Sequence, residues 1–182
     1  MRPIFTLHAG EYLVGSYLET KFKNVALWVP ARDIGIDLLV TDRRRRKALG
    51  FQVKFSKDFL VTHRGPEFQQ RLRATGWWTI KRTKLAQSVA DYWVFVLQGF
   101  ASRTTDFVVV PRGELLRKID AIHGRRSIFQ LYLTVTADGR CWETRGLKAA
   151  EQLSIALGGS SQPKRDLTRW LNNWKPVSQL NR

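Results

Sequence analysis

The sequence predicts an α/β or α+β domain in which helices flank a mixed central sheet, with a helical appendage at the C-terminal end. Three observations favour this class. Apolar residues recur at helical spacing near the start, a hairpin pattern follows, and later runs rich in β-branched and aromatic residues alternate with helical patterns. The 182 residues suffice for one core-forming domain. We expect that domain over residues 1–159, and a linker with a basic amphipathic helix over 160–182.

The first predicted helix covers about residues 9–22, where apolar side chains recur every three to four positions. Glu11 stands three residues before Val14 and seven before Leu18, so its side chain is expected near the buried face. The alternative is that Glu11 is a first-turn acid favoured by the helix dipole. A short strand over 24–29 then ends at Pro30.

Two apolar-rich runs joined by a polar, basic link predict an antiparallel hairpin over residues 35–55. A turn centred in the four-arginine tip places Asp37 opposite Gln52. Because side chains alternate across a strand, Asp37, Gln52 and Lys54 then share one face. The opposite face is apolar and is expected to enter the core; it carries Leu38, Val40, Phe51, Val53 and Phe55.

The segment 56–84 is basic and shows no clear period. Within it, Trp77 and Trp78 stand among cations, which suits stacking on exposed bases; the alternative is core or lid packing, because Trp is usually well buried. Later patterns predict a helix over 83–90, strands over 91–97 and 106–111, a helical segment over 114–119, a strand over 129–136 that turns toward 141–143, and a helix over 147–157.

The C-terminal segment carries Leu167, Trp170, Leu171 and Trp174 at helical spacing. This stripe predicts a helix that docks on the domain. The alternative is a contact between two copies of the chain, which would make the protein a homodimer.

Lys and Arg outnumber Asp and Glu by 31 to 15, which gives a net charge of +16. Such a surplus attracts polyanions, and nucleic acid is the expected partner. The single Cys141 excludes a disulfide framework and a cysteine zinc site. The first residues lack the pattern of a signal peptide, and no apolar run approaches the ~20 residues of a membrane span. We therefore expect a cytoplasmic protein without a membrane partner.

The shared polar face of the hairpin suits phosphodiester hydrolysis. An Asp carboxylate and a neighbouring side-chain oxygen can hold Mg²⁺, which favours oxygen ligands. The ion would polarise a phosphoryl oxygen and lower the pKa of a bound water. A Lys beside it can orient or deprotonate that water and offset developing negative charge.

These residues resemble the PD-(D/E)xK nuclease superfamily, which includes restriction enzymes and archaeal Holliday-junction resolvases. The resemblance covers a helical Glu, a Gly-Ile-Asp at the head of one strand and a Gln-Val-Lys on the next. It implies a restriction-endonuclease-like sheet, with Asp37 as the central metal ligand and Lys54 as the catalytic lysine. It further implies that Glu11 and the Val53 carbonyl help to bind the metal.

Gln52 departs from the family pattern, because most members have Glu or Asp there. Some active branches carry Gln, including an intron-encoded homing endonuclease group. A neutral amide removes one negative charge, so Mg²⁺ should bind more weakly. Gln52 nevertheless stays in the predicted catalytic and metal-binding set.

The sequence therefore predicts a Mg²⁺-dependent DNA endonuclease, with Mn²⁺ as a substitute ion and duplex or branched DNA as substrate. The alternatives are an inactive nucleic-acid-binding module of the same fold and an RNA-binding protein. The arginine tip lies roughly 20 Å along the strand from Asp37, so it is expected to contact flanking phosphate only. The expected nucleic-acid contacts are Arg43, Arg44, Arg45, Arg46, Lys57, Arg71, Arg73, Lys81 and Arg82.

Overall fold

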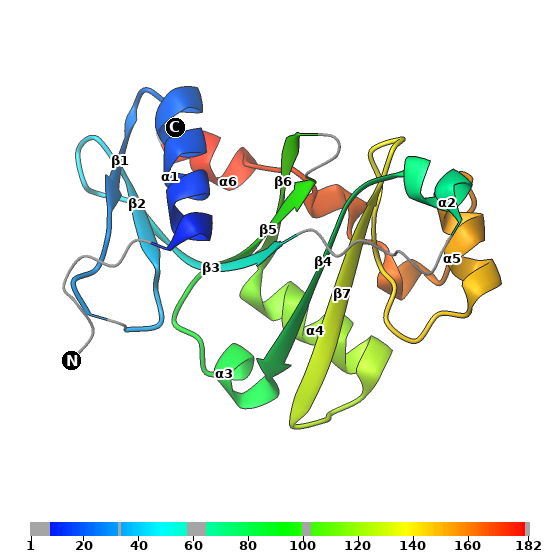
Figure 1. Ribbon diagram of the computed structural model, residues 1–182. Helices are drawn as coiled ribbons and strands as arrows, with labels where there is room; N and C mark the ends of the chain where they lie inside the picture. The colour runs from blue at the N-terminus through cyan, green and yellow to red at the C-terminus, as the bar shows by residue number, and fades with distance from the viewer. Residues whose placement is uncertain (1–7, 33, 58–64, 100–102, 181–182) are drawn as a thin grey trace.

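A computed structural model of the chain describes residues 8–32, 34–57, 65–99 and 103–180. It contains a five-stranded sheet in the order β1-β2-β3-β5-β6, in which β3 and β5 are parallel and all other neighbours antiparallel. The predicted mixed sheet with flanking helices is thus confirmed (Figure 1). The strands of this sheet are β1 (Val25–Trp28), β2 (Leu38–Asp42), β3 (Ala48–Lys57), β5 (Tyr92–Gly99) and β6 (Thr104–Pro111).

A second sheet has three antiparallel strands in the order β4-β7-β8. Its strands are β4 (Leu72–Lys81), β7 (Ile128–Thr136) and β8 (Cys141–Glu143). β4 lies in the segment 56–84, whose sequence shows no clear period. The sequence therefore predicted only one of the two sheets. Packing leaves no room for a side chain at Gly76, because a Cβ would stand 2.7 Å from the Trp78 indole and 3.2 Å from the Ser56 Cβ of β3. Ser56 Oγ also accepts the Trp77 N–H at 3.2 Å, which links the two sheets.

The helices are short. They are α1 (Ala9–Lys21), α2 (Pro66–Gln70), α3 (Arg82–Ala86), α4 (Arg112–His123), α5 (Ala149–Ala156) and α6 (Lys175–Ser178). Within the described ranges, no helix is both long and apolar enough to cross a membrane. In Figure 1, α1 lies beside β1 and β2 at one end of the molecule, and α2 and α5 lie at the other end, beyond β4 and β7.

The five-stranded sheet separates two apolar cores. On one face, Val94 and Val96 of β5 pack with α1 and the C-terminal segment. On the other, Trp93 and Phe95 pack with the three-stranded sheet and α4. β5 is therefore buried on both sides, as its continuous apolar run predicts.

The predicted hairpin register is confirmed. Leu38 pairs with Phe51 and Thr41 with Ala48, so the turn is centred within the arginine tip. Leu38, Val40, Phe51 and Val53 enter the core beneath α1, as the alternation requires. Asp37 immediately precedes β2 and its N–H donates to the Phe51 carbonyl at 2.8 Å.

The predicted C-terminal helix is wrong. The segment forms two 3₁₀ turns, η1 (Pro163–Arg165) and η2 (Thr168–Trp170), and then the four-residue α6. Asn172 has a φ of +51° and exchanges hydrogen bonds with the backbone of Phe107, whose amide donates to its Oδ1 at 2.8 Å. Polar side chains that bond to backbone compete with the helical ladder in this way.

The apolar stripe of that segment is nevertheless buried. Leu167 and Trp170 belong to the core around the three-stranded sheet, whereas Trp174, Val177 and Leu180 belong to the core beneath α1. The segment therefore contributes side chains to both cores and is part of the packed domain, not a separate helical appendage. Of the two interpretations of the stripe, packing on the domain is the one that the structure shows.

Candidate active site

The first turn of α1 packs closely against β3. A Cβ on Gly10 would stand 2.7 Å from the Phe55 Cβ and 3.2 Å from a methyl group of Val53. Only a residue without a side chain permits this approach without a shift of backbone. The contact brings the neighbouring Glu11 to the open end of the hairpin.

The open end of the hairpin is organised around one carboxylate oxygen. Oδ2 of Asp37 accepts the Val53 N–H at 2.6 Å and also accepts a hydrogen bond from the Gln52 side-chain amide. Gln52 is only 3% exposed, so this contact replaces water for a buried amide. Turning the amide by half a rotation would present its oxygen in place of its NH₂ group.

A hollow of about 520 Å³ opens beside Asp37. All five residues predicted from sequence to form the catalytic and metal site line it: Glu11, Asp37, Gln52, Val53 and Lys54. It is also lined by His8, Ala9, Gly10, Phe55 and Lys84. Residues from α1, the hairpin and α3 therefore meet at one place.

His8 and Lys84 were missed as site residues by the sequence reasoning. His8 shares no metal-ligand spacing with the other histidines, but it stands three residues before Glu11 at the N-cap of α1, a local signal that could have identified it. Lys84 comes from α3, far along the chain, and only the tertiary structure brings it to the hollow.

Lys54 lies on the same face as Asp37 and Gln52, as the alternation predicts. Its Nζ stands 5.6 Å from the centroid of the Trp93 ring, within range of a cation–π contact. Trp93 is fully buried and pairs with Gln52 across β3 and β5. The buried ring gives the lysine side chain a fixed surface to lie against.

Glu11 has both of the roles that were considered for it. Its Oε2 accepts the His8 N–H at 3.1 Å, so it caps the first turn of α1, and its side chain also lines the hollow. Burial raises the pKa of this carboxyl above its ordinary value of 4.5, and the negative charge of Asp37 adds to the rise. The His8 N–H and the charge of Lys54 act in the opposite direction.

Glu11→Gln should make the protein more stable at neutral pH. A raised folded-state pKa means that wild-type stability falls as pH rises from 4.5 through the folded-state value, because an ionised carboxylate is buried. The variant keeps an oxygen that accepts the His8 N–H. Its neutral amide does not ionise, so its stability does not fall as pH rises through this range. The gain in Tm over wild type should therefore be larger at pH 7 than at pH 4, as measured by thermal denaturation.

The matched control is Glu19→Gln, on an exposed position of the same helix, which should leave the pH dependence unchanged. If Glu11→Gln lowered the Tm more at pH 7 than at pH 4, the carboxylate would be stabilised in place and the assigned cause would be wrong. If Glu11 helps to bind a metal ion, Glu11→Gln should also lower the activity by about 10- to 100-fold.

The hollow offers the oxygen donors that a hard cation prefers. The side chains of Asp37, Glu11 and Gln52 supply three, and Val53 can supply its carbonyl. Because the N–H and C=O of one strand residue point to the same edge, the Val53 carbonyl points to the edge where its N–H meets Asp37. Among the described residues, no group of three or more His, Cys, Asp or Glu side chains could hold a metal ion. Two carboxylates with waters and substrate phosphates are a common Mg²⁺ environment, so the residues fit.

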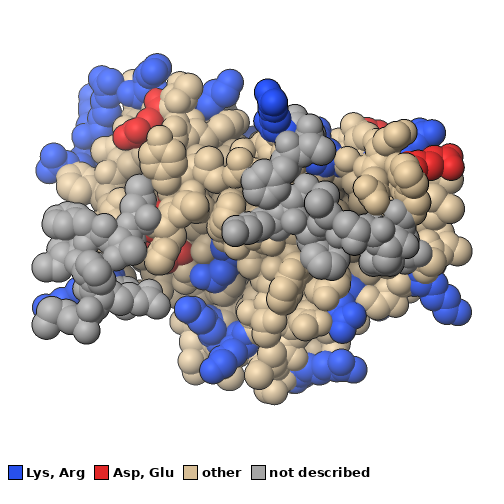
Figure 2. Space-filling view, in the orientation of Figure 1, with Lys and Arg blue, Asp and Glu red and all other residues tan. Residues whose placement is uncertain are grey.

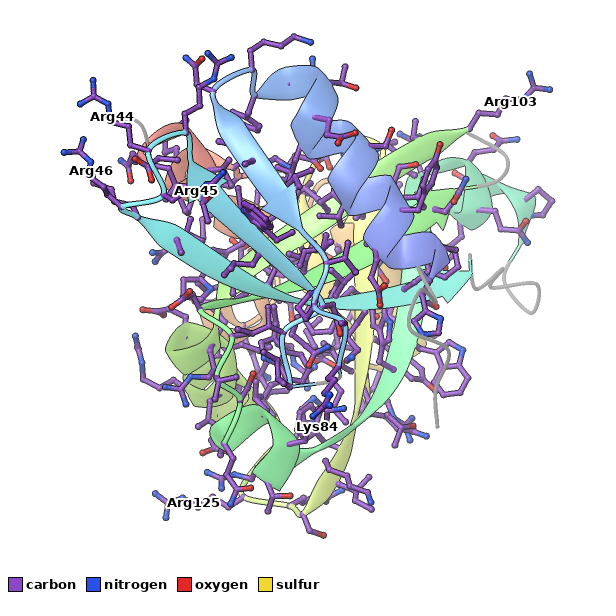
Figure 3. All side chains as sticks on the ribbon, turned by 90° about the vertical axis from the view of Figure 1, so that its left-hand side faces the viewer. Arg44, Arg45, Arg46, Lys84, Arg103 and Arg125 are labelled. Carbon is purple, nitrogen blue, oxygen red and sulfur yellow. The ribbon has the colours of Figure 1, made fainter. Side chains whose placement is uncertain are left out.

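The arginine tip lies away from the hollow. Figure 3 shows Arg44, Arg45 and Arg46 at the far end of the hairpin from Lys84. Arg43 donates to the Lys23 carbonyl at 3.0 Å, and the Arg45 guanidinium lies 5.4 Å from the centroid of the Trp28 ring. Arg43 and Arg45 therefore contact residues near β1, and none of these residues lines the hollow.

Two of the other predicted contacts form ion pairs. Arg73 holds the buried Asp106 through two hydrogen bonds of 2.7 and 2.8 Å. Arg82 holds Asp120 in the same way, at 2.6 and 2.7 Å. Both guanidinium groups link elements of the fold and have their charge balanced locally, so they are poorer phosphate ligands than the sequence suggested.

The remaining predicted contacts are exposed or lie outside the description. Arg71 and Lys81 are exposed, whereas the side chain of Lys57 is outside the described part of the structure. Figure 2 shows Lys and Arg side chains spread around much of the visible face, with Asp and Glu at few places. The positive charge is therefore distributed over the surface rather than confined to the tip.

The two adjacent tryptophans have different environments. Trp78 is 7% exposed and belongs to the core between the sheets, whereas Trp77 is 44% exposed. Neighbouring strand residues point to opposite faces, so core packing is confirmed for Trp78, whereas stacking of a base on the exposed Trp77 stays a prediction. The local signal that separates the two is alternation, because Ala74 and Ile80 share the face of Trp78.

Comparison with known proteins identifies no relative: no family model, no curated protein and no solved structure matches the chain.

Proposed function

We propose that this protein is a metal-dependent endonuclease that hydrolyses phosphodiester bonds in DNA. The observation that carries the proposal is the convergence of Glu11, Asp37, Gln52, Val53 and Lys54 on one hollow. Oxygen donors and a lysine beside them are what phosphodiester hydrolysis requires. A net charge of +16 supplies the attraction for the substrate.

In this proposal the Asp37 carboxylate, the Val53 carbonyl and Glu11 would hold Mg²⁺, and Gln52 would add its oxygen with its amide turned. The bound ion would polarise a phosphoryl oxygen and lower the pKa of a coordinated water. Mn²⁺, which prefers similar ligands, substitutes for it.

The other side chains act on the water and the phosphate. Lys54 orients or deprotonates the attacking water and offsets the negative charge that develops on the phosphoryl group. Lys84 lies on the wall of the same hollow and contacts a phosphate of the bound strand. The arginine tip holds flanking duplex phosphate.

The resemblance to the PD-(D/E)xK superfamily supports the same proposal. We assign the restriction-endonuclease-like core to α1, the β1–β2–β3 meander and β5. We also propose a cytoplasmic location, which suits the free, buried Cys141 thiol. The DNA is duplex or branched.

A second candidate is an inactive nucleic-acid-binding module of the same fold. One observation favours it: one oxygen of the Asp37 carboxylate, Oδ2, already accepts hydrogen bonds from the Val53 N–H and from the Gln52 amide. If the amide keeps this orientation, the donor set loses one oxygen. Binding would then persist without cleavage.

The two candidates are separated by incubating the protein with supercoiled plasmid, a branched DNA and an RNA, each with Mg²⁺, Mn²⁺ or EDTA. The endonuclease proposal predicts nicked or cut DNA with either ion, no product with EDTA and intact RNA. Asp138→Asn, at a surface carboxylate paired with Arg140, is the control and should cut as wild type does. Salt-sensitive DNA binding with no product under any ion would establish the inactive module instead.

A further inference from the structure

The outer face of the three-stranded sheet carries an aromatic row beside a cation. Trp77 of β4 pairs with Tyr132 of β7, and their ring centroids are 6.3 Å apart. The guanidinium of Arg145 stands 5.1 Å from the centroid of the Tyr132 ring. Trp77 is 44% exposed. An exposed aromatic ring near a cation is typical of surfaces on which nucleic-acid bases stack.

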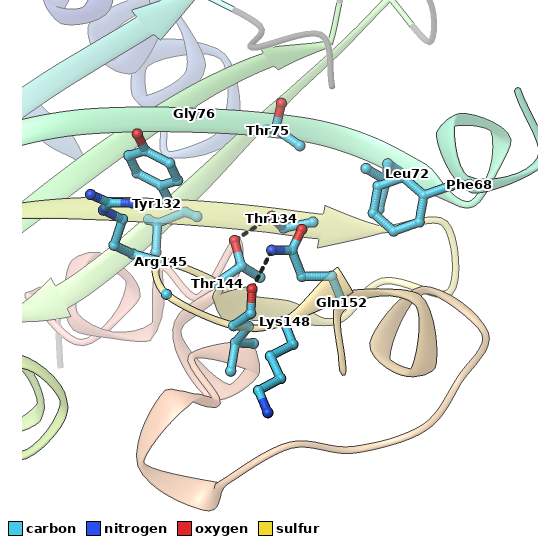
Figure 4. Close-up of a pocket in the computed structure, with 13 residues that line it drawn as sticks. Phe68, Leu72, Thr75, Gly76, Tyr132, Thr134, Thr144, Arg145, Lys148 and Gln152 are labelled. Carbon is cyan, nitrogen blue, oxygen red and sulfur yellow. Dashed lines mark hydrogen bonds between the residues drawn. The ribbon is translucent and has the colours of Figure 1, made fainter. Parts of the chain in front are cut away.

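One hollow, of about 450 Å³, lies beside Tyr132, which lines it (Figure 4). Its polar walls include Thr134 and Thr144, whose hydroxyls are hydrogen-bonded at 3.0 Å, and Gln152, whose amide donates to the Leu147 carbonyl at 2.9 Å. Lys148 also lines it. Hydroxyl and amide groups beside an aromatic surface can bond to the edge of a base that stacks on that surface.

A second hollow, of about 590 Å³, is lined by Arg126, Arg145, Arg165 and His123. Arg165 is buried, and its Nε has no hydrogen-bond partner in the described part of the chain. One acid, Glu143, is bonded to Arg165, so arginines outnumber acids around this hollow. The charge of Arg165 is paired with Glu143, so the positive charge available to an anion in this hollow comes from Arg126 and Arg145.

The two hollows are adjacent. Both are lined by Arg145 and Gly146, and they follow each other along the same pair of strands: the first contains Thr75 and the second Thr79. Four residues of a strand span about 13 Å. The pair of Trp77 and Tyr132 lies between these two positions along the strands, and Tyr132 also lines the first hollow. We name the two hollows together with this pair the outer groove.

The wall that carries Arg145 is held in place by buried charge. The Arg145 N–H donates to Glu143 Oε1 at 3.0 Å, and its carbonyl accepts from Arg165 at 3.0 Å. Glu143 is fully buried and paired with Arg165. The backbone of the groove wall is therefore fixed before any ligand arrives, which lowers the entropic cost of binding.

We propose that the outer groove binds single-stranded nucleic acid. A base stacks on the exposed ring of Trp77, with Tyr132 beside it, and phosphates lie against Arg145 and the arginines of the second hollow. A single strand fits better than a duplex, because the base faces that an aromatic row contacts are already stacked inside a duplex. The groove is separate from the Asp37 hollow, shares none of its lining residues, and would bind whether or not that hollow cuts DNA.

The test measures binding of a fluorescein-labelled oligo-dT by anisotropy, in EDTA, over a range of salt concentrations. Trp77→Leu should weaken binding roughly 5- to 150-fold, the usual effect of losing one aromatic–base stack, and Trp77→Phe should restore most of it. Arg145→Ala should lower the slope of log affinity against log salt by about 0.7, as expected for one phosphate contact. Lys175→Ala, at an exposed lysine on α6, is the matched control and should bind as wild type does.

Competitors define the ligand. Unlabelled oligo-dT and oligo-U should displace the probe, whereas thymidine monophosphate and a blunt duplex should do so much more weakly. Equal affinity of wild type, Trp77→Leu and Arg145→Ala for the probe would overturn the proposal, as would thymidine monophosphate binding as tightly as the oligonucleotide. Because EDTA is present throughout, failure here is distinct from failure of the endonuclease proposal, which a plasmid assay with metal decides.

Discussion

Asp37→Asn is expected to reduce DNA cleavage at least 100-fold while leaving DNA binding unchanged or stronger. Asn keeps the volume of the side chain and an oxygen that can accept the Val53 N–H, so the hairpin should retain its shape. The variant loses the charge that would hold the ion, and stabilisation of that kind accounts for factors of about 10² to 10³ in rate. Removing a carboxylate also removes repulsion of phosphate. Plasmid nicking and DNA anisotropy measure the two effects separately.

Lys54→Met is the companion variant. It keeps an apolar side chain against Trp93 and removes the ammonium, so turnover should fall more than metal affinity does. Calorimetric titration of Mg²⁺ into both variants separates the two roles: heat should be lost with Asp37→Asn and retained with Lys54→Met. Cleavage that persists in Asp37→Asn at the wild-type rate would remove Asp37 from the site.

Trp174→Ala is expected to lower the free energy of unfolding by about 3–5 kcal/mol, a large share of the ~5–15 kcal/mol of a typical domain. The Trp174 ring lies 5.6 Å from that of Tyr17, 5.5 Å from Phe107 and 6.0 Å from Phe51, measured between centroids. Truncation would leave a cavity between α1 and the sheet. Urea denaturation should show one cooperative transition with a lower midpoint.

The neighbouring Lys175→Ala is the control and should change stability by no more than about 0.5 kcal/mol, because Lys175 is exposed. Trp174→Phe should fall between the two, since it keeps part of the ring contact and removes an indole N–H that has no hydrogen-bond partner within the described ranges. A loss below 1 kcal/mol in Trp174→Ala, or a separate early transition, would mean that the C-terminal segment packs as an appendage.

The sequence predicted most accurately where the relevant interactions are local. The hairpin register follows from the short basic link and from the alternation of Leu38, Val40, Phe51 and Val53, and it was confirmed pair by pair. The first helix was predicted within one residue at its C-terminal end. These features depend on neighbours within about one turn or one hairpin, so a local pattern contains the necessary information.

β4 was missed because its pattern is interrupted. Its inner face does alternate, through Ala74, Gly76, Trp78 and Ile80, but the exposed Trp77 and the central glycine hide that period. The partner of β4 is β7, about fifty residues later, so the two strands are not joined by a short turn that would indicate their pairing in the sequence. In the C-terminal segment the apolar stripe is buried as predicted, but it does not form a helix. Asn172 instead accepts a hydrogen bond from the backbone N–H of the distant Phe107.

The sequence alone determined which side chains share the polar face of the hairpin, since alternation and a short turn admit one register. Only the tertiary structure decided what meets that face. The close approach at Gly10 brings Glu11 to it, the crossover from β3 to β5 brings Lys84, and both depend on contacts between segments far apart in the chain. The same long-range packing neutralised Arg73, buried Trp78 and left Trp77 exposed, because burial is a property of the whole fold and not of the neighbouring residues.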